Sequence, residues 1–261
     1  MIVRKPSVAG SFYPAQPDRL RRQVVELLAD AGTALKITPK ALIVPHAGYI
    51  YSGSTAAAAF ATLRDSARRL ARIVLIGPAH YVAIRGIAVP TVDAFETPLG
   101  RMSVDHDALN EITGLPFVSR NDAAHAPEHA LEVELPFLQI VLPSFSLLPL
   151  VVGEATEHEV GQVLARLWTS PETLLVISSD LSHYHSYETA RRLDAATAAA
   201  IENGDWAGLG PGQACGYLPI AGLLIEANRH KLKARRLSLC SSGDTAGPRD
   251  QVVGYGAWMF S

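Results

Sequence analysis

The sequence predicts an α/β fold, namely a three-layer α/β/α domain with a largely parallel (mixed) central sheet. Short apolar runs alternate along the chain with stretches of helical periodicity, which is the order that βαβ units produce. Several of these runs are continuously apolar, so both faces of the sheet must be covered. Hydrophobic residues make up 48% of the 261 residues, and no repeat or low-complexity linker divides them. We therefore expect a single domain over residues 1–261.

The strands are predicted from short apolar runs bounded by turn residues. Ala41–Val44 is the first, and the second, over 73–76, ends at Gly77 and Pro78. A third and a fourth buried run cover 147–152 and 174–177. Strands over 235–239 and 252–260 complete the predicted sheet.

The helices are predicted from apolar residues at helical spacing. The first runs from Leu20 to Leu28, after Pro17 and Asp18, which suit a helix start. A capping-box pattern, Thr156 with Glu159, precedes a helix over 160–168. The other predicted helices cover 54–63, 128–142, 187–202 and 219–228.

The charge balance argues against a general nucleic-acid binder. Lysine and arginine number 23 against 25 acidic residues, a net charge of −2, without the basic surplus that such proteins need. Two cysteines in a chain of this length exclude a disulfide-stapled scaffold. The first residues lack an apolar signal region, and no apolar run approaches the roughly 20 residues that span a bilayer. We expect a cytoplasmic protein with reduced thiols and no membrane partner.

Polar residues follow three of the predicted buried strands. His46 comes after the first strand, His80 after the second, and Asp180 and His183 after the strand over 174–177. Ligands of open α/β sheets bind beyond the carboxyl ends of the strands, where these side chains would converge. One histidine at such a place usually closes a loop, but the same arrangement on three strands favours a functional cluster. Because neutral imidazole ligates metals, the cluster predicts a metal site or an acid–base site.

A stable metal site needs a ligand beyond two histidines. Cys215 is one candidate, because Gly212 and Gly216 permit close approach of the backbone; the alternative role of this cysteine is a small buried hydrophobe. Asp180 is the rival third ligand, or it orients a histidine from outside the ligand set. For Cys240 we expect the role of a buried hydrophobe.

Weaker candidates surround these residues. Glu128 and His129 lie at the start of a predicted helix, where the dipole alone favours a glutamate. This polar helix start, with His125 beside it, could also face the cleft. Tyrosines are ordinary in surface loops, yet four could wall an aromatic-sized pocket, namely Tyr49, Tyr81, Tyr184 and Tyr217. Three histidines lie among charged or turn residues and are expected at the surface: His106, His158 and His230.

Several segments together resemble the signatures of the Memo family (mediator of ErbB2-driven cell motility). They are 10–14, 44–53, 77–80, 128–132, 178–183 and 215–220, in the family's order and spread over nearly the whole chain. The resemblance implies a Memo-like domain over 1–261 with the LigB-like fold of class III extradiol ring-cleaving dioxygenases. In prokaryotes the family is also called AmmeMemoRadiSam system protein B, which implies AMMECR-type and radical-SAM partner proteins.

The resemblance also implies roles for residues. The dioxygenases hold non-haem Fe(II) with two histidines and a glutamate, and in Memo-like proteins a cysteine takes the carboxylate position. The implied metal ligands are His46, His80 and Cys215. Asp180 and His183 would line the same pocket as catalytic residues, with His183 as the acid/base. Tyr81 departs from the family, which often has a second histidine at this place.

Three functions fit these residues. The first is a metal-dependent redox enzyme, most simply with Fe(II), because two imidazoles and one anion leave open positions for substrate and oxygen. A thiolate makes the site softer, so copper or zinc also fits. The second is a binding module that holds a peptide or protein in a vestigial pocket. The third is a zinc-dependent hydrolase. A small molecule or a peptide occupies the cleft in each, no nucleic acid is expected, and the oligomeric state stays open.

Overall fold

Four parallel strands form the centre of the fold. The computed structural model describes residues 1–32, 37–168 and 170–261. Its central strands are β2 (Ala41–Val44), β9 (Thr173–Ser178), β3 (Arg72–Pro78) and β8 (Ser146–Val152), adjacent in that order. All their residues are buried except the first of β3 and of β8. This burial on both faces confirms the α/β fold predicted from the continuous apolar runs.

The sheet extends on both sides with antiparallel neighbours. On one side β12 (Val252–Phe260) pairs with β2, and both β11 (Ala234–Ser241) and β10 (His183–His185) pair with β12. On the other side β4 (Ile87–Val89) pairs with β8 and β7 (Val118–Arg120) with β4. A separate small sheet contains β1 (Val3–Arg4), β5 (Ala94–Thr97) and β6 (Gly100–Ser103). Of these strands only β11 and β12 were predicted. The others have two to four residues each, too few to show a periodic pattern in the sequence.

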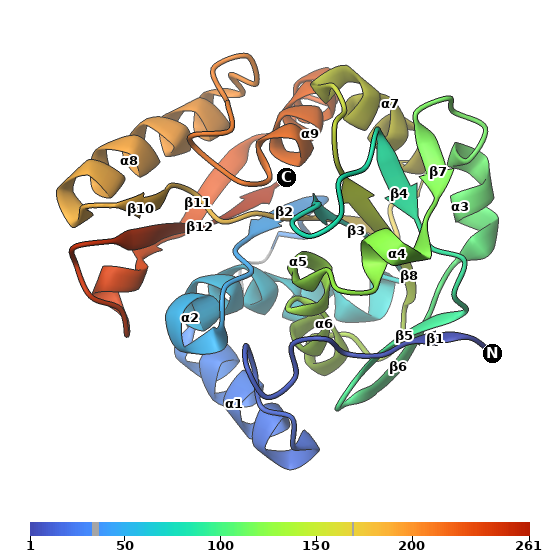
Figure 1. The fold of residues 1–261 in the computed structure, drawn as a ribbon, viewed down its shortest axis with the longest axis horizontal. Helices are drawn as coiled ribbons and strands as arrows, with labels where there is room; N and C mark the ends of the chain where they lie inside the picture. The colour runs from blue at the N-terminus through green and yellow to red at the C-terminus, as the bar shows by residue number, and fades with distance from the viewer. Residues whose placement is uncertain (33–36, 169) are drawn as a thin grey trace.

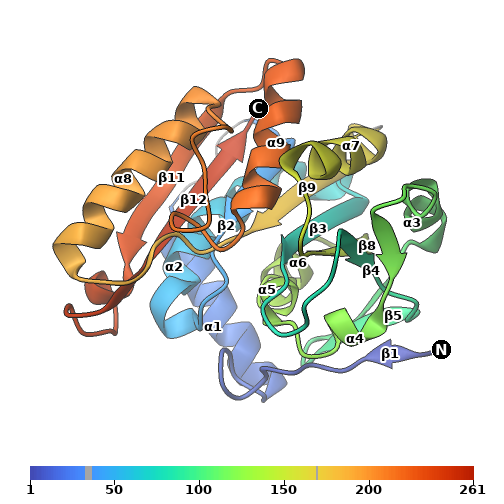
Figure 2. The same cartoon turned by 45° about the horizontal axis from the view of Figure 1, so that its top comes forward.

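Helices cover the two faces of the large sheet (Figures 1 and 2). The lower layer in Figure 2 contains α1 (Pro17–Asp30), α2 (Tyr49–Phe60) and α6 (Leu135–Val141), which pack against one another. The opposite layer contains α3 (His106–Ile112), α7 (Glu157–Leu167) and α9 (Tyr217–Arg229), while α8 (Tyr187–Asn203) lies along β11 and β12. The predicted capping box of Thr156 and Glu159 is present at the start of α7.

Two predicted helices differ from the structure. The helix predicted over 128–142 is two helices, α5 (His129–Glu132) and α6. Pro136 explains the break, because it has no N–H to donate to the carbonyl of Glu132 and its ring clashes with a continuous helix. The helix predicted over 54–63 begins earlier, as α2 at Tyr49, and continues after Phe60 as a 3-10 helix, η1 (Ala61–Arg69). Two further short elements are α4 (Asp122–His125) and η2 (Ser242–Asp244).

The strand register brings three chain segments to one place. Val44 of β2 pairs with Ser178 of β9, and Ile76 of β3 pairs with Ile177 of β9. The three parallel strands therefore end at nearly the same level, and the residues after them share one edge of the sheet. Among the described residues, no helix combines the length and the hydropathy that a membrane-crossing segment needs.

Candidate metal centre

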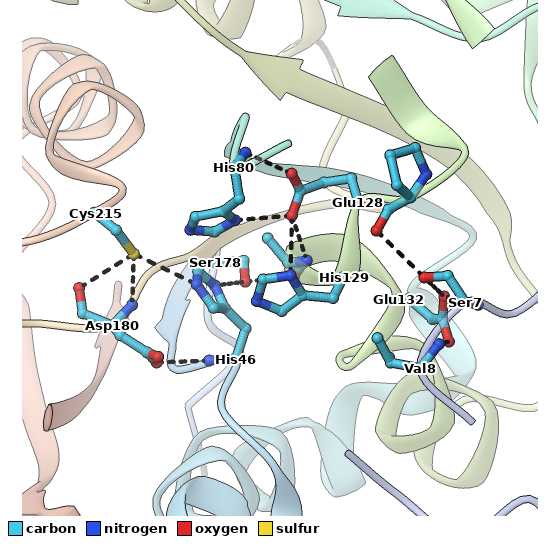
Figure 3. A network of polar contacts seen from close by, with 12 residues as sticks. Ser7, Val8, His46, His80, Glu128, His129, Glu132, Ser178, Asp180 and Cys215 are labelled. Atoms are coloured by element: carbon cyan, nitrogen blue, oxygen red, sulfur yellow. Dashed lines mark hydrogen bonds and ion pairs between the residues drawn. The ribbon is translucent and has the colours of Figure 1, made fainter. Parts of the chain in front are cut away.

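The segments after β2, β3 and β9 carry His46, His80 and Asp180, and the loop before α9 brings Cys215 to them (Figure 3). The Cys215 N–H donates to the carbonyl of Asp180 at 3.2 Å. The N–H of Gly216 donates to Ser179 Oγ at 2.9 Å. A side chain at 216 would bring a carbon within 2.7 Å of Ser179 Cβ, so glycine is required for this loop to dock on the end of β9.

His46, His80 and Cys215 present ligand atoms that all lie within 4.8 Å of one another. Cys215 Sγ lies 3.4 Å from His46 Nε2, and the two imidazole rings are 5.1 Å apart at 78°. Two ligands of one ion are separated by less than the sum of their bond lengths, about 4.3 Å for a thiolate and an imidazole on zinc. The sulfur and the His46 nitrogen satisfy this limit, so this pair can hold one transition-metal ion, and a ligand atom of His80 lies within 4.8 Å of both.

Ser178 determines which nitrogen of His46 faces the cysteine. Ser178 Oγ lies 2.6 Å from the carbonyl oxygen of Ala130 and 2.7 Å from His46 Nδ1. The carbonyl can only accept, so the single hydroxyl hydrogen goes to Ala130 and the Ser178 oxygen accepts from His46. We therefore assign the hydrogen of His46 to Nδ1. This leaves the lone pair on Nε2, the atom that faces Cys215.

Glu128 holds His80 in the same manner. One carboxylate oxygen lies 2.8 Å from His80 Nδ1, and the other accepts the His80 N–H at 2.7 Å. Burial alone would raise the pKa of Glu128, but the hydrogen bonds from His80 and Ala130 outweigh it and hold that pKa below its ordinary range. A carboxylate on Nδ1 is the usual outer partner of a metal-binding histidine and leaves Nε2 for the ion. Glu128 thus lies behind His80 rather than on the wall of an open pocket.

Asp180 is engaged with the backbone of the His46 segment. Its Oδ1 accepts the His46 N–H at 2.9 Å. Burial raises the pKa of Asp180 to about 7, against the lowering effect of the hydrogen bonds from His46 and Ala47. In the described part of the chain it is Cys215, not Asp180, that completes a ligand group with the two histidines. The geometry therefore favours Asp180 as a residue that orients His46.

A cavity of about 460 Å³ opens in front of the histidines. His183 lies on its wall, where burial lowers the pKa of the imidazole despite a hydrogen bond with Leu181. His129 lies there as well and stacks on His80 at 4.7 Å. His80, Glu128 and His129 form a second ligand group, which shares His80 with the first. The other side chains around the cavity include Phe12, Ile50, Tyr51, Tyr184, Val253 and Tyr255.

The four candidate tyrosines are not equivalent. Tyr184 lines the cavity, and Tyr81 lies 5.6 Å from the His129 ring. Tyr217 lines a different cavity, of about 570 Å³, which Cys215 also borders. Tyr49 does not line the cavity with the histidines: it is buried at the start of α2, and its hydroxyl donates to the Val133 carbonyl at 2.8 Å. The prediction for Tyr49 is corrected, because α2 begins at this residue and turns the ring into the core.

The remaining histidines lie outside the cavity. His125 is buried, with its ring 3.1 Å from the Ala88 carbonyl oxygen, in the region of β4. His158 and His230 are exposed, as predicted, and His106 is half-buried. Cys240 is partly buried and lies 3.1 Å from the hydroxyl of Thr55.

Three polar residues around the site had no predicted role. Ser178 and Glu132 lie inside segments that carry the Memo resemblance, and Glu134 lies between Val133 and Leu135. All three are buried. A glutamate within so apolar a stretch is the signal that could have singled out Glu134, since buried carboxyl groups need a partner.

Burial sets the charge of the site at neutral pH. It lowers the pKa of His46 well below the ordinary value, with help from His80 and His129. Burial also lowers the pKa of His129 to about 4. The pKa of the Cys215 thiol is raised to about 12 by burial and by Asp180. At neutral pH the imidazoles of His46 and His129 are therefore neutral and the thiol of Cys215 is protonated.

Metal binding at neutral pH should release one proton per ion, from Cys215. A thiol must lose its proton to ligate, whereas His46, whose pKa is lowered, has none to lose. The apparent affinity should then rise about tenfold per pH unit around neutrality. Calorimetric titration in buffers of different ionisation enthalpy measures the released proton. Cys215→Ser should release one proton fewer than wild type, and a wild-type protein that releases none would contradict the role of the thiol.

Comparison with known proteins assigns the family. The model of the Memo-like protein family matches residues 4–259. This chain belongs to the Memo-like family. A MEMO1 family protein of Aquifex aeolicus is 36% identical over 100% of both chains. A MEMO1 family protein of Nitrosopumilus maritimus is 32% identical over 99% of this chain and 100% of its own.

A solved structure supports the fold of this Memo-like chain. The crystal structure of the uncharacterized protein JW3007 from Escherichia coli K12 superposes with a TM-score of 0.51 at 15% identity. It covers 85% of this chain and 99% of its own. The likeness concerns the α/β fold alone.

Proposed function

We propose that this Memo-like protein binds one transition-metal ion through His46, His80 and Cys215, and that it carries out metal-dependent redox chemistry on a small molecule in the adjoining cavity. The observation that carries the proposal is the convergence of two oriented imidazoles and one sulfur, with ligand atoms within 4.8 Å of one another. Outer partners hold both rings, Ser178 for His46 and Glu128 for His80. Such partners are typical of metal-binding histidines.

The resemblance to the ring-cleaving dioxygenases favours Fe(II), and the donor set also suits copper or zinc. Imidazole ligates all three, and a thiolate shifts the preference toward softer ions. A redox-active ion held there would supply electron transfer to or from a molecule in the cavity. The chain contributes the cavity and a base. His183 lies on the cavity wall with a lowered pKa, so its neutral imidazole can accept a proton from a bound substrate.

Metal analysis and oxygen uptake test the proposal. Protein purified without oxygen should contain close to one iron or copper ion per chain. The Fe(II)-loaded protein should consume oxygen with catechols, the substrates of the ring-cleaving dioxygenases to which the Memo resemblance points. His183→Ala should slow this uptake by about 10²–10⁴-fold while the metal content stays unchanged. His158→Ala, at an exposed histidine packed on Trp206, is the matched control.

Two outcomes would contradict the redox proposal. One is a loaded protein that takes up no oxygen with any catechol. The other is stoichiometric zinc without iron or copper, which would favour the zinc-dependent hydrolase. The AMMECR-type and radical-SAM partner proteins stay a prediction from the family resemblance.

A second candidate function, peptide or protein binding, has an observation of its own. Three large hydrophobic side chains are exposed near the metal cavity: Ile50 by 63%, Tyr81 by 56% and Tyr184 by 73%. Exposed apolar residues grouped around a cavity are typical of surfaces that bind partners. If a peptide is the ligand and the metal is not part of its site, His46→Ala should abolish metal binding and leave peptide affinity intact.

A further inference from the structure

The carboxyl group of Glu134 is buried next to the metal centre without a cation. The residue occupies the N-cap position of α6, makes no capping hydrogen bond with its side chain, and is fully buried. One of its oxygens, Oε1, lies 3.1 Å from Ser178 Oγ. The other, Oε2, has no hydrogen-bond partner among the described residues. No lysine, arginine or histidine of the described chain forms an ion pair with it. An ionised carboxylate is very costly in such surroundings.

Counting donors around Ser178 indicates that Glu134 carries a proton. A serine hydroxyl can donate once and accept twice. Ser178 has three neighbours: the Ala130 carbonyl at 2.6 Å, His46 Nδ1 at 2.7 Å and Glu134 Oε1 at 3.1 Å. The carbonyl takes the only hydroxyl hydrogen, so the other two neighbours must donate. Glu134 can donate only as a neutral carboxylic acid.

The same count shows what an ionised Glu134 would do. A carboxylate at 3.1 Å from Ser178 would compete with Ala130 for one hydrogen. Either the carbonyl or the carboxylate would then be left buried without a hydrogen-bond partner, which is unfavourable for any polar group and most of all for a charged one. Burial, together with the nearby Asp180, raises the pKa of Glu134 well above its ordinary range, in agreement with the donor count.

We propose that Glu134 is a positioning residue: a neutral carboxylic acid that donates to Ser178 and thereby holds His46 with its hydrogen on Nδ1 and its lone pair on Nε2. Its effect on metal binding rests on the proposed function, but its protonation and the His46 tautomer do not. With this hydrogen bond, Ser178 uses its one hydrogen and both acceptor positions, so the hydroxyl has a single orientation. His46 is then fixed before any ion arrives.

Infrared and NMR spectra of the metal-free protein test the proposal directly. The difference spectrum of wild type and Glu134→Gln at neutral pH should contain the C=O stretching band of a protonated carboxylic acid. Asp180 has a pKa of about 7 and therefore contributes a carboxylic-acid band of its own at neutral pH. The control variant Asp180→Asn identifies that band, so that it is not mistaken for the band of Glu134. In histidine-labelled protein, the nitrogen shifts should place the His46 hydrogen on Nδ1 in wild type and in Glu134→Gln. Absence of the Glu134 band would overturn the proposal.

Measurements of metal affinity distinguish a positioning role of Glu134 from an effect of its charge. Ser178→Ala, which removes the direct partner of His46, should weaken binding by about 10–100-fold. Glu134→Gln should stay within about threefold of wild type, because its amide N–H can donate to Ser178 as the acid does. Glu134→Leu, which removes the donor, should weaken binding by about tenfold, at the low end for such partners. Equal losses in Glu134→Gln and Glu134→Leu would show that a negative charge matters and would overturn the proposal. A wild-type protein that binds no metal would contradict the proposed function, while the spectra would still decide the state of Glu134.

Discussion

Cys215→Ser is expected to lower the affinity of the protein for its metal ion by about two to three orders of magnitude. Structural zinc sites with four ligands bind their ion with about 10–16 kcal/mol, so one ligand carries about 3–4 kcal/mol, which is two to three orders of magnitude in affinity. A serine hydroxyl does not ionise at neutral pH and is a poor ligand for soft ions. The sulfur of Cys215 lies 3.4 Å from His46 Nε2, within reach of a shared ion. Without this sulfur only the two histidines remain as ligands, which are too few for a stable site. Competition with a chromophoric chelator under anaerobic conditions measures the change.

Two variants control for this result. Cys240→Ser replaces the other cysteine, which lies beside Thr55 and belongs to no ligand group of the described residues, and should retain wild-type affinity. Asp180→Asn keeps an acceptor for the His46 N–H and should weaken binding by no more than about 10–100-fold, the range for an outer partner. If Cys215→Ser retains metal and Asp180→Asn loses it, the third ligand is Asp180.

Arg4→Ala should destabilise the fold by about 3–5 kcal/mol, because it leaves the carboxylate of Glu132 buried without its partner. Arg4 is 5% exposed and Glu132 fully buried, and the two form an ion pair. The guanidinium also donates to the carbonyls of His125, at 3.1 Å, and Glu128, at 2.7 Å. It therefore connects the N-terminal segment to the turn that carries the outer partner of His80. Urea unfolding at neutral pH, followed by circular dichroism, measures the loss.

Lys5→Ala is the matched control for Arg4→Ala. Lys5 is the next residue and pairs with Glu96, but its side chain is 64% exposed. Exposed pairs contribute about 0–1 kcal/mol, so the unfolding midpoint of Lys5→Ala should stay close to that of wild type. A loss of less than about 1 kcal/mol of unfolding free energy in Arg4→Ala would contradict this prediction. It would show that the hydrogen bonds from the N–H groups of Ser7 and Val8 are enough to stabilise the buried Glu132 carboxylate.

The comparison of sequence and structure is clearest at the loop that carries Cys215. The sequence offered Cys215 and Asp180 as rival ligands, and neither spacing nor composition could choose between them. The choice depends on how the loop before α9 docks on the end of β9, through the hydrogen bonds of Cys215 and Gly216. Such contacts join residues far apart in the chain, so local patterns do not encode them. The same holds for Tyr49, whose ring faces the core because α2 begins there.

By itself the sequence determined the fold class, the central strands and the convergence of His46, His80, Asp180 and His183. Continuous apolar runs can be satisfied only as strands buried on both faces, and parallel strands bring the residues after them to one edge. The tertiary structure alone decided how the histidines are held, through Ser178, Glu128 and the buried Glu134. These partners lie at the N-cap positions of α5 and α6 and at the end of β9. Their roles depend on ångström-scale distances that appear only once the layers are packed.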